Sequence, residues 1–357
     1  MKLILCGDIV PTEYTTATFD RQDCAELMGD TLPALRAADF AVANLECALT
    51  NADTPIRKCG PNLKGRPEFA RVLAECGFTH LGMSNNHVMD FGEAAMRETE
   101  RAIREAGMIP FGTGENDQDS RKAVYLEKDG VRAAILAVCE HEYSYALPKH
   151  YGANPFDPFD TMEDIALAKE KADYVIVMYH GGKEQSQFPS PRLRKACRAM
   201  VRAGADLILC QHSHCVGCHE TYRGGQIVYG TGNFNFVHYL EHPHWHSGLM
   251  LRASVDKNGL TVEYLPVVPN ERLTGIELAK GERKEAILAG FEARSVTLQD
   301  EDAWMKEWRA FCEGVRPNYE SAASRFGEQI FPHYLDCEAH LDVWQTLFET
   351  WHKTDKT

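Results

Sequence analysis

The sequence has no long uninterrupted apolar segment and no excess of basic residues. No stretch reaches the roughly 18 apolar residues that a membrane-spanning helix needs. The first apolar run, MKLILCGDIV, breaks at Gly7-Asp8, short of the about 7–15 apolar residues of a signal peptide. The formal net charge of −14 argues against a broad nucleic-acid-binding surface. We therefore expect a cytoplasmic protein with no membrane span and no nucleic-acid partner.

The chain also lacks a second Cys-x-x-Cys pair, although it has 12 cysteines. Cys215 and Cys218 form the single pair, inside a histidine-rich segment, CQHSHCVGCH. A structural zinc site needs four ligands, so this pair alone does not make one. Local loop chemistry is the favoured interpretation. The alternative is that His238, His242, His244 and His246 complete a zinc site or extend the rim of another site. The other cysteines are expected to be reduced and mostly buried.

Short apolar runs alternate with amphipathic stretches over most of the chain. Several runs are apolar throughout, which is typical of strands covered on both faces. Strands are predicted at 2–6, 40–44, 79–83, 132–139, 174–179, 206–210 and 226–229, with helices at 67–76, 92–106, 162–171 and 191–203. This alternation predicts an α/β protein. Further on, Lys257-Asn258-Gly259 joins two apolar runs and predicts a β-hairpin at 249–268.

From about residue 280 the sequence becomes polar and helical. Spaced aromatic anchors lie at Trp304, Trp308, Phe311, Trp344, Phe348 and Trp351. We expect a helical appendage that packs on the main domain, or a partner-binding or lid element, with residues 353–357 frayed. The predicted division is a main domain at residues 1–270 and a helical C-terminal extension at residues 271–357.

Polar side chains follow almost every predicted strand at the point where the strand ends. These strand ends carry Asp8, Asn44 to Glu46, Ser84 to His87 with Asp90, His180 with Glu184, His212 with His214, and Gly232 to Phe234. In open α/β sheets, ligands bind outside the carboxyl ends of the strands. Each residue alone has an ordinary explanation as a helix cap, a turn residue or a core histidine. The ordered set favours one common site.

The residue types in this set suit divalent metal ions. Carboxylates, an amide oxygen and several imidazoles favour Mn, Fe or Zn over a thiolate-rich structural zinc. Two ions about 3.5–4 Å apart need a bridging carboxylate, for which Glu46 and Asp8 are candidates. If 212–214 stays extended, its two histidines point the same way. His87 is free to act as a general acid, and Asp90 is placed to orient it or raise its pKa.

These motifs, in this order, resemble the CapA-type poly-γ-glutamate capsule synthesis (PGA_cap) proteins, a branch of the calcineurin-like metallophosphoesterase superfamily. The resemblance runs from residue 7 to about 236 and rests on Gly7-Asp8, Asn44-Leu45-Glu46, Lys58-Cys59-Gly60-Pro61, Ser84-Asn85-Asn86-His87 with Asp90 and Gly92, His180-Gly181-Gly182 with Glu184, Gly204-Ala205-Asp206 with His212-Ser213-His214, and Gly232-Asn233-Phe234. It implies a four-layer α/β/β/α sandwich with one or two divalent metal ions (Mn, Fe or Zn) at the sheet edge.

The resemblance also implies a role for each site residue. It assigns Asp8 and His214 to the first metal, Glu46 to the bridge, Asn86, His180 and His212 to the second metal, and proton donation to His87. One departure affects the first metal. The superfamily usually opens with Asp-x-His, whereas Ile9-Val10 follow Asp8 here, and Asn44-Leu45-Glu46 replaces the usual Gly-Asp-x-x-Asp. The chain is therefore expected to hold one tight metal, two weak ones, or none.

A basic segment lies between Glu46 and the next predicted helix, with Arg57, Lys58, Lys64 and Arg66. Beside a metal site in an acidic protein, it suits a phosphate or polycarboxylate ligand, and the alternative is a solvated loop. Lys58 also lies in the family's Lys-x-Gly-Pro motif. We expect Lys58, Glu184 and Asn233 to contact the substrate.

The resemblance makes a metal-dependent hydrolase the leading hypothesis. Such an enzyme acts on a phosphoester, or on a γ-glutamyl or related amide bond, in capsule or envelope polymer metabolism. Its expected partners are an anionic or peptide-like small molecule or polymer, and capsule-synthesis proteins. Two alternatives remain: a metal-free acid/base enzyme of the epimerase type acting on a peptide, and a non-catalytic subunit of a capsule synthase that binds polymer.

Overall fold

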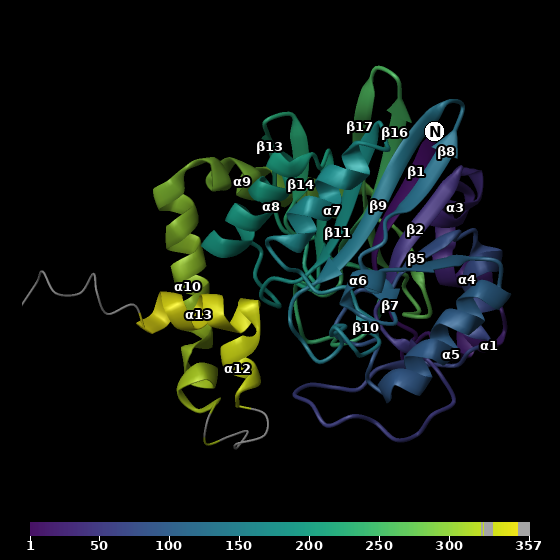
Figure 1. Cartoon of the computed structure of the whole chain (residues 1–357), viewed down its shortest axis with the longest axis horizontal. Helices are drawn as coiled ribbons and strands as arrows, with labels where there is room; N and C mark the ends of the chain where they lie inside the picture. The colour runs from purple at the N-terminus through teal and green to yellow at the C-terminus, as the bar shows by residue number, and fades with distance from the viewer. Residues whose placement is uncertain (323, 325–330, 349–357) are drawn as a thin grey trace, which may run out of the picture.

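The computed structural model describes residues 1–322, 324 and 331–348, and two β-sheets form its centre (Figure 1). The first sheet has the order β18-β17-β16-β1-β2-β5-β6, with β15 beside β1. Its strands are β1 (Lys2–Ile9), β2 (Phe40–Leu45), β5 (His80–Gly82), β6 (Ile109–Phe111), β15 (Asn233–Asn235), β16 (Gly248–Asp256), β17 (Gly259–Pro269) and β18 (Ile276–Leu278).

The second sheet has the order β13-β14-β12-β11-β9-β8. Its strands are β8 (Val124–Lys128), β9 (Val131–Cys139), β11 (Tyr174–His180), β12 (Leu207–Gln211), β13 (His219–Tyr222) and β14 (Gly225–Val228). Two small pairs complete the strands: β3 (Ala48–Leu49) with β4 (Lys64–Gly65), and β7 (Thr113–Gly114) with β10 (Gly152–Ala153).

Helices cover the outer face of each sheet. The first sheet is covered by α1 (Thr16–Asp20), α2 (Cys24–Met28), the 3-10 turn η1 (Gly29–Thr31), α3 (Leu32–Ala37), α4 (Phe69–Cys76) and α5 (Gly92–Glu105). The second is covered by α7 (Asp160–Lys169) and α8 (Pro191–Ala203), and the short α6 (Asp117–Ser120) lies beside β7 and β10. The predicted helices therefore form, with bounds shifted by a few residues at most.

Alternating side chains along each central strand build two different cores. On β1, Leu3 and Leu5 pack between the sheets, whereas Ile4 and Cys6 pack against the helices. The same alternation on β11 sends Met178 inward and Tyr179 outward. Because successive strand residues point to opposite faces, both faces of each sheet are buried. The predicted four-layer α/β/β/α sandwich is confirmed.

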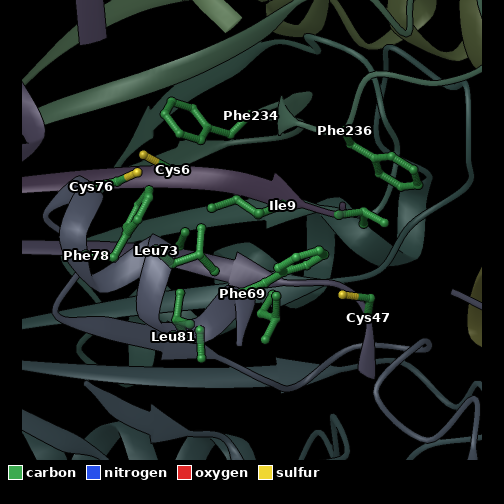
Figure 2. Packing of buried hydrophobic residues seen from close by; sticks show 14 of the residues in the cluster. Cys6, Ile9, Cys47, Phe69, Leu73, Cys76, Phe78, Leu81, Phe234 and Phe236 are labelled. Carbon is green, nitrogen blue, oxygen red and sulfur yellow. The ribbon is translucent and has the colours of Figure 1, made fainter. Parts of the chain in front are cut away.

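Figure 2 shows part of the core between the first sheet and its helices. Phe69, Leu73 and Cys76 of α4 recur at helical spacing, so they form one apolar face that packs on this sheet. The helix ends at Gly77, whose φ of 109° lies in the left-handed region that glycine adopts without strain.

The parallel register aligns the strand ends that carry the predicted site residues. In the first sheet, Asp8 pairs with Asn44 of β2 and with Asn233 of β15. In the second sheet, His180 pairs with Gln211 of β12. The strand β1 is longer than predicted and runs to Ile9, so Asp8 belongs to the strand rather than following it. The carboxyl ends of both sheets therefore meet at one edge.

The chain after the sheets is helical, as expected. It forms α9 (Gly281–Gln299), α10 (Glu301–Glu320), α12 (His333–Asp336) and α13 (Glu338–Phe348). The helix α9 lies along β13, and α10, α12 and α13 stand beside the sandwich in Figure 1. Around Trp308, these last three helices share their own small apolar cluster. The division at residue 270 stays a prediction, although β18 still belongs to the sheet. Trp351 and residues 353–357 lie outside the described residues.

The predicted hairpin is present as β16 and β17, which pair in an antiparallel register. Its turn follows Asp256, whose side chain accepts hydrogen bonds from the amides of Asn258 and Gly259. Among the described helices, none combines the length and apolar character needed to cross a bilayer.

Candidate metal centre

The predicted ligands, which are far apart in the sequence, meet at the shared edge of the two sheets. None is more than 7% exposed: Asp8, Glu46, Asn86, His180, His212 and His214. Contacts across the sheets hold them together. The amide of His212, after β12, donates to Asp8 Oδ2 of β1 over 3.2 Å. The convergence depends on the parallel strands, because their carboxyl ends lie at the same edge.

Glu46 occupies the middle of this cluster. Its Oε1 lies 3.3 Å from His180 Nε2 and 3.7 Å from His214 Nε2. Neither carboxylate oxygen has a hydrogen-bond partner among the described residues, and the side chain is fully buried. Burial, with the charges of Asp8 and Glu184, raises the pKa of Glu46 well above its usual range. A buried carboxylate without partners is costly, so its environment fits a bound cation.

Asp8 is held in place by its neighbours. Asn44 Nδ2 donates to Asp8 Oδ1 over 2.7 Å and lies 3.2 Å from His180 Nδ1. Burial raises the pKa of Asp8 to about 6, although the hydrogen bonds from Asn44 and from the amide of His212 lower it. These contacts fix Asp8 while leaving lone pairs on its carboxylate.

The possible ligand atoms form two overlapping sets that share Glu46. One set is Asp8, Glu46 and His180, and the other is Glu46, His212 and His214. This grouping differs from the division that the resemblance implies, in which His214 joins Asp8 and His180 joins Asn86. Contacts for that division are also present, because His214 Nδ1 lies 3.7 Å from Asp8 Oδ2 and Asn86 Oδ1 lies 3.0 Å from His180 Nε2. The division of ligands between ions stays a prediction, whereas Glu46 takes part in both sets.

His212 and His214 do not continue an extended strand, contrary to the sequence-based expectation. Their φ angles are 76° and 52°, in the left-handed region that non-glycine residues rarely occupy. Such strained residues cluster at functional sites. The tight turn still brings both imidazoles to Glu46, and His212 Nδ1 has no hydrogen-bond partner among the described residues.

A second cluster, next to the ligands, surrounds His87. Its Nδ1 lies 2.7 Å from Asp90 Oδ2 and 3.1 Å from Lys58 Nζ. The shorter contact is to the carboxylate, which only accepts, so we assign the proton to Nδ1. Lys58 Nζ donates to Asp90 Oδ1 over 2.5 Å and to the Asn86 carbonyl over 3.2 Å. Burial and Lys58 lower the pKa of His87, whereas Asp90 raises it. Asp90 therefore orients His87, with Nε2 as the nitrogen left for another group.

The three predicted substrate contacts lie in different environments. The side chain of Lys58 is 2% exposed and forms an ion pair with Asp90. Asn233 is also engaged, since its Oδ1 lies 2.9 Å from His214 Nδ1 and its Nδ2 donates to the Trp245 carbonyl over 3.2 Å. Glu184 is about half exposed at 48% and lies at the rim. Contact with substrate stays a prediction for all three.

The basic loop is largely paired within the protein. Lys64 Nζ lies 2.7 Å from Asp53, and Arg66 pairs with Asp20. Arg57 is exposed.

Two polar residues next to the ligands were given no role of their own in the sequence analysis, although Asn44 was among its polar strand ends. Asn44 fixes Asp8, as described above. Glu142, just after β9, accepts from Asn86 Nδ2 over 2.7 Å, and its Oε1 lies 3.7 Å from His212 Nε2. The rule applied to the other strand ends points to Glu142 as well, because it follows β9, which runs parallel to β11.

The Cys-x-x-Cys pair is separate from this cluster. Cys215 Sγ contacts the Ser186 carbonyl at 3.2 Å, and Cys218 is packed in the core beneath α8. In the described part of the chain, neither thiol belongs to a group of three or more potential metal ligands, and neither do His242, His244 and His246. The two thiols therefore lie where packing within the loop and the core accounts for them.

A family model described as "Bacterial capsule synthesis protein PGA_cap" matches residues 2–238. The chain belongs to this family. Within the family, capsule biosynthesis protein CapA of Bacillus anthracis is 31% identical over 66% of this chain and 60% of its own length. PGA biosynthesis protein CapA of Bacillus subtilis is 32% identical over 64% of this chain and 62% of its own length. The chain thus matches less than two-thirds of each relative.

Solved structures resemble the chain only loosely. A putative 5′-nucleotidase from Staphylococcus aureus, solved with α-ketoglutarate, has a TM-score of 0.47 at 15% identity, over 82% of this chain and 58% of that one. This likeness adds no argument about chemistry.

Proposed function

We propose that the chain is a metal-dependent hydrolase that acts on a phosphoester, or on a γ-glutamyl or related amide bond, in capsule polymer metabolism. The observation that carries the proposal is Glu46. It is a fully buried carboxylate whose two oxygens lack hydrogen-bond partners among the described residues, and it belongs to both potential ligand sets. That is the environment expected of a carboxylate that bridges two divalent ions.

The ligand chemistry supports Mn, Fe or Zn as the bound ion. Asp8, Glu46, His180, His212 and His214 offer carboxylate oxygens and imidazole nitrogens and no thiolate. Divalent ions in such a site act as Lewis acids and make water acidic enough to attack at neutral pH.

His87 is the proposed proton donor to the leaving group. Asp90 holds the Nδ1–H, so Nε2 is the nitrogen that delivers a proton in the protonated ring. Lys58 holds Asp90 in turn, which keeps the ring orientation fixed. Asn86, the residue before His87, joins this pair to the ligand cluster through its contact with His180.

The substrate class comes from two lines of support. The named relatives are capsule and PGA biosynthesis proteins, and PGA is poly-γ-glutamate, an anionic polymer joined by amide bonds. The exposed carboxylate of Glu184 interacts electrostatically with His212 and His214, so it offers a contact for a substrate amine beside the ligands. We therefore propose an anionic γ-glutamyl compound or a phosphoester as substrate.

The test compares metal content and turnover in three variants of the full chain, purified without a histidine tag. Glu46→Gln and His212→Ala should lower the Mn, Fe or Zn content found by elemental analysis and abolish hydrolysis. His87→Ala should retain metal and lose turnover by about 10²–10⁴-fold, the usual contribution of general acid–base catalysis. The control is His238→Ala, which removes a histidine outside both ligand sets and should change neither quantity.

Three outcomes would overturn the proposal. A protein that is active without any transition metal would instead support the acid/base epimerase alternative. Metal binding without hydrolysis of any phosphoester or γ-glutamyl substrate would support a polymer-binding subunit. Loss of metal in His87→Ala would show that the roles of ligand and proton donor are assigned wrongly.

A further inference from the structure

A second group of potential metal ligands lies between the C-terminal helices and the rim of the sandwich. It contains Glu142, His333, Cys337 and His340, and the possible ligand atoms of all four lie within 4.8 Å of one another. Only Glu142 falls inside the stretch matched by the family model, which ends at residue 238. The other three come from the segment HYLDCEAH, at α12 and the start of α13.

The contacts within the group already resemble a coordination shell. Cys337 Sγ lies 3.3 Å from Glu142 Oε1, and His333 Nε2 lies 3.9 Å from the same oxygen. Ligand atoms around a tetrahedral zinc ion lie roughly 3.5 Å apart, given bond lengths of about 2.0–2.3 Å. Cys337 is fully buried, and the Glu142 and His333 side chains are each 11% exposed. Small side-chain movements would bring these ligand atoms to the separations expected around zinc.

The outer nitrogens of both histidines face other polar groups. His340 Nδ1 is hydrogen-bonded to the Tyr319 hydroxyl at 2.8 Å, and His333 Nδ1 lies 3.5 Å from the Asp336 carboxylate. Metal-bound histidines almost always have such a partner on the second ring nitrogen, because it fixes the tautomer and the orientation of the ring. This arrangement leaves Nε2 of each ring for a metal.

We propose that Glu142, His333, Cys337 and His340 bind a zinc ion that fastens the C-terminal helices to the sandwich. One thiolate, two imidazoles and one carboxylate fill all four positions of a tetrahedral zinc ion with protein groups, as structural zinc sites do, and leave no position open for water. Binding breaks the S–H bond of Cys337, whose proton passes to solvent, and forms a zinc–sulfur bond. Zinc needs no redox partner for this step.

Glu142 also joins this site to the candidate metal centre. Its Oε2 accepts from Asn86 Nδ2 over 2.7 Å, and its Oε1 lies 3.7 Å from His212 Nε2. Zinc held by Glu142 therefore fixes the position of the helices relative to Asn86 and His212. The zinc site does not depend on the proposed hydrolase activity, because it uses none of the family's motif residues.

The experiment uses the full chain, stripped of metal and reloaded with Co²⁺ or Zn²⁺. Co²⁺ should give a sulfur-to-cobalt charge-transfer absorption, since the candidate metal centre holds no thiolate and this site does. Cys337→Ser should abolish that absorption and remove one equivalent of bound zinc. The matched control is Cys312→Ser, a buried cysteine of the same helices outside the ligand group, which should retain both.

A second variant keeps the test valid if Cys337→Ser misfolds. His333→Asn should lower zinc affinity at least tenfold and shift the cobalt spectrum, and circular dichroism should show an unchanged helix content. Chelation of wild-type protein should also speed proteolytic cleavage between the sandwich and α13.

The proposal is refuted if the cobalt protein shows no thiolate absorption, or if Cys337→Ser retains it. If the proposed hydrolase function is wrong but the zinc site is right, the two metal signals should separate. Glu46→Gln should lose the metal of the candidate centre and still show the thiolate absorption, whether or not any substrate is hydrolysed.

Discussion

The buried ion pair of Lys58 and Asp90 allows a quantitative prediction for Asp90→Asn. Lys58 Nζ and Asp90 Oδ1 are 2.5 Å apart, and their side chains are 2% and 0% exposed. Asp90 Oδ2 also accepts from the Leu63 amide over 2.6 Å and from His87. The substitution keeps the size of the side chain but removes its charge, which leaves the Lys58 ammonium buried beside a neutral amide.

Breaking a buried pair from one side costs about 3–5 kcal/mol, because the remaining charge is desolvated without compensation. The chain contains a matched control in the same basic loop. Lys64 Nζ and Asp53 Oδ1 are 2.7 Å apart, but their side chains are 34% and 91% exposed. Solvent screens an exposed pair so strongly that it contributes little to stability, so Asp53→Asn should leave the free energy of unfolding almost unchanged. Burial, not distance, separates the two variants.

Urea unfolding followed by tryptophan fluorescence measures both variants under the same conditions. Asp90→Asn should lower the midpoint several times more than Asp53→Asn. The double variant Lys58→Met/Asp90→Asn should recover most of the loss, since replacing both partners with groups of similar volume removes the buried charge. Equal midpoints for the two single variants would refute the reasoning, and so would a double variant less stable than Asp90→Asn.

Two further predictions concern packing. A Cβ at Gly248 would lie 1.8 Å from the Asn233 carbonyl oxygen, so Gly248→Ala should destabilise the protein by about 1–3 kcal/mol or more and displace Asn233 from His214. Gly259→Ala is the control and should be nearly neutral, because the space around its Cβ is open. Thermal unfolding of both variants measures the difference, and an equal loss of stability would contradict the prediction. Trp308 is fully buried and its indole donates to Thr346 Oγ1 over 2.9 Å, so Trp308→Ala should cost the C-terminal helices about 3–5 kcal/mol. Phe348→Ala, at a side chain that is 39% exposed, should cost much less, and proteolysis of the extension compares the two.

Most of the fold follows from periodicity in the sequence. Apolar runs such as residues 174–179 predict strands buried on both faces, and the spacing of Phe69, Leu73 and Cys76 predicts a helix with one apolar face. The strand ends could be predicted as a set because parallel strands place their carboxyl ends at one edge. Because of that rule, Asp8 and His180 are expected to be neighbours although they are 172 residues apart in the sequence.

Local geometry was harder to predict from the same residues. The alternation of side chains along an extended chain suggested that His212 and His214 point the same way, but both adopt left-handed backbone conformations. Cross-sheet contacts, such as the bond from the His212 amide to Asp8, accompany that turn, and they are not encoded in nearby sequence. Lys58 was expected at a substrate, and its burial beside Asp90 became visible only in the folded chain.

The sequence alone predicts the α/β alternation and the edge where the polar strand ends meet, and its ordered motifs carry the resemblance that implies the four layers and the family. These features depend on periodic side-chain direction and on chain order, which are local or repeated properties. The position of the C-terminal helices is visible only in the folded chain, and so is the meeting of Glu142 with His333, Cys337 and His340. Their contact joins segments nearly two hundred residues apart through helix packing, and no short-range pattern specifies which surface such a helix will cover.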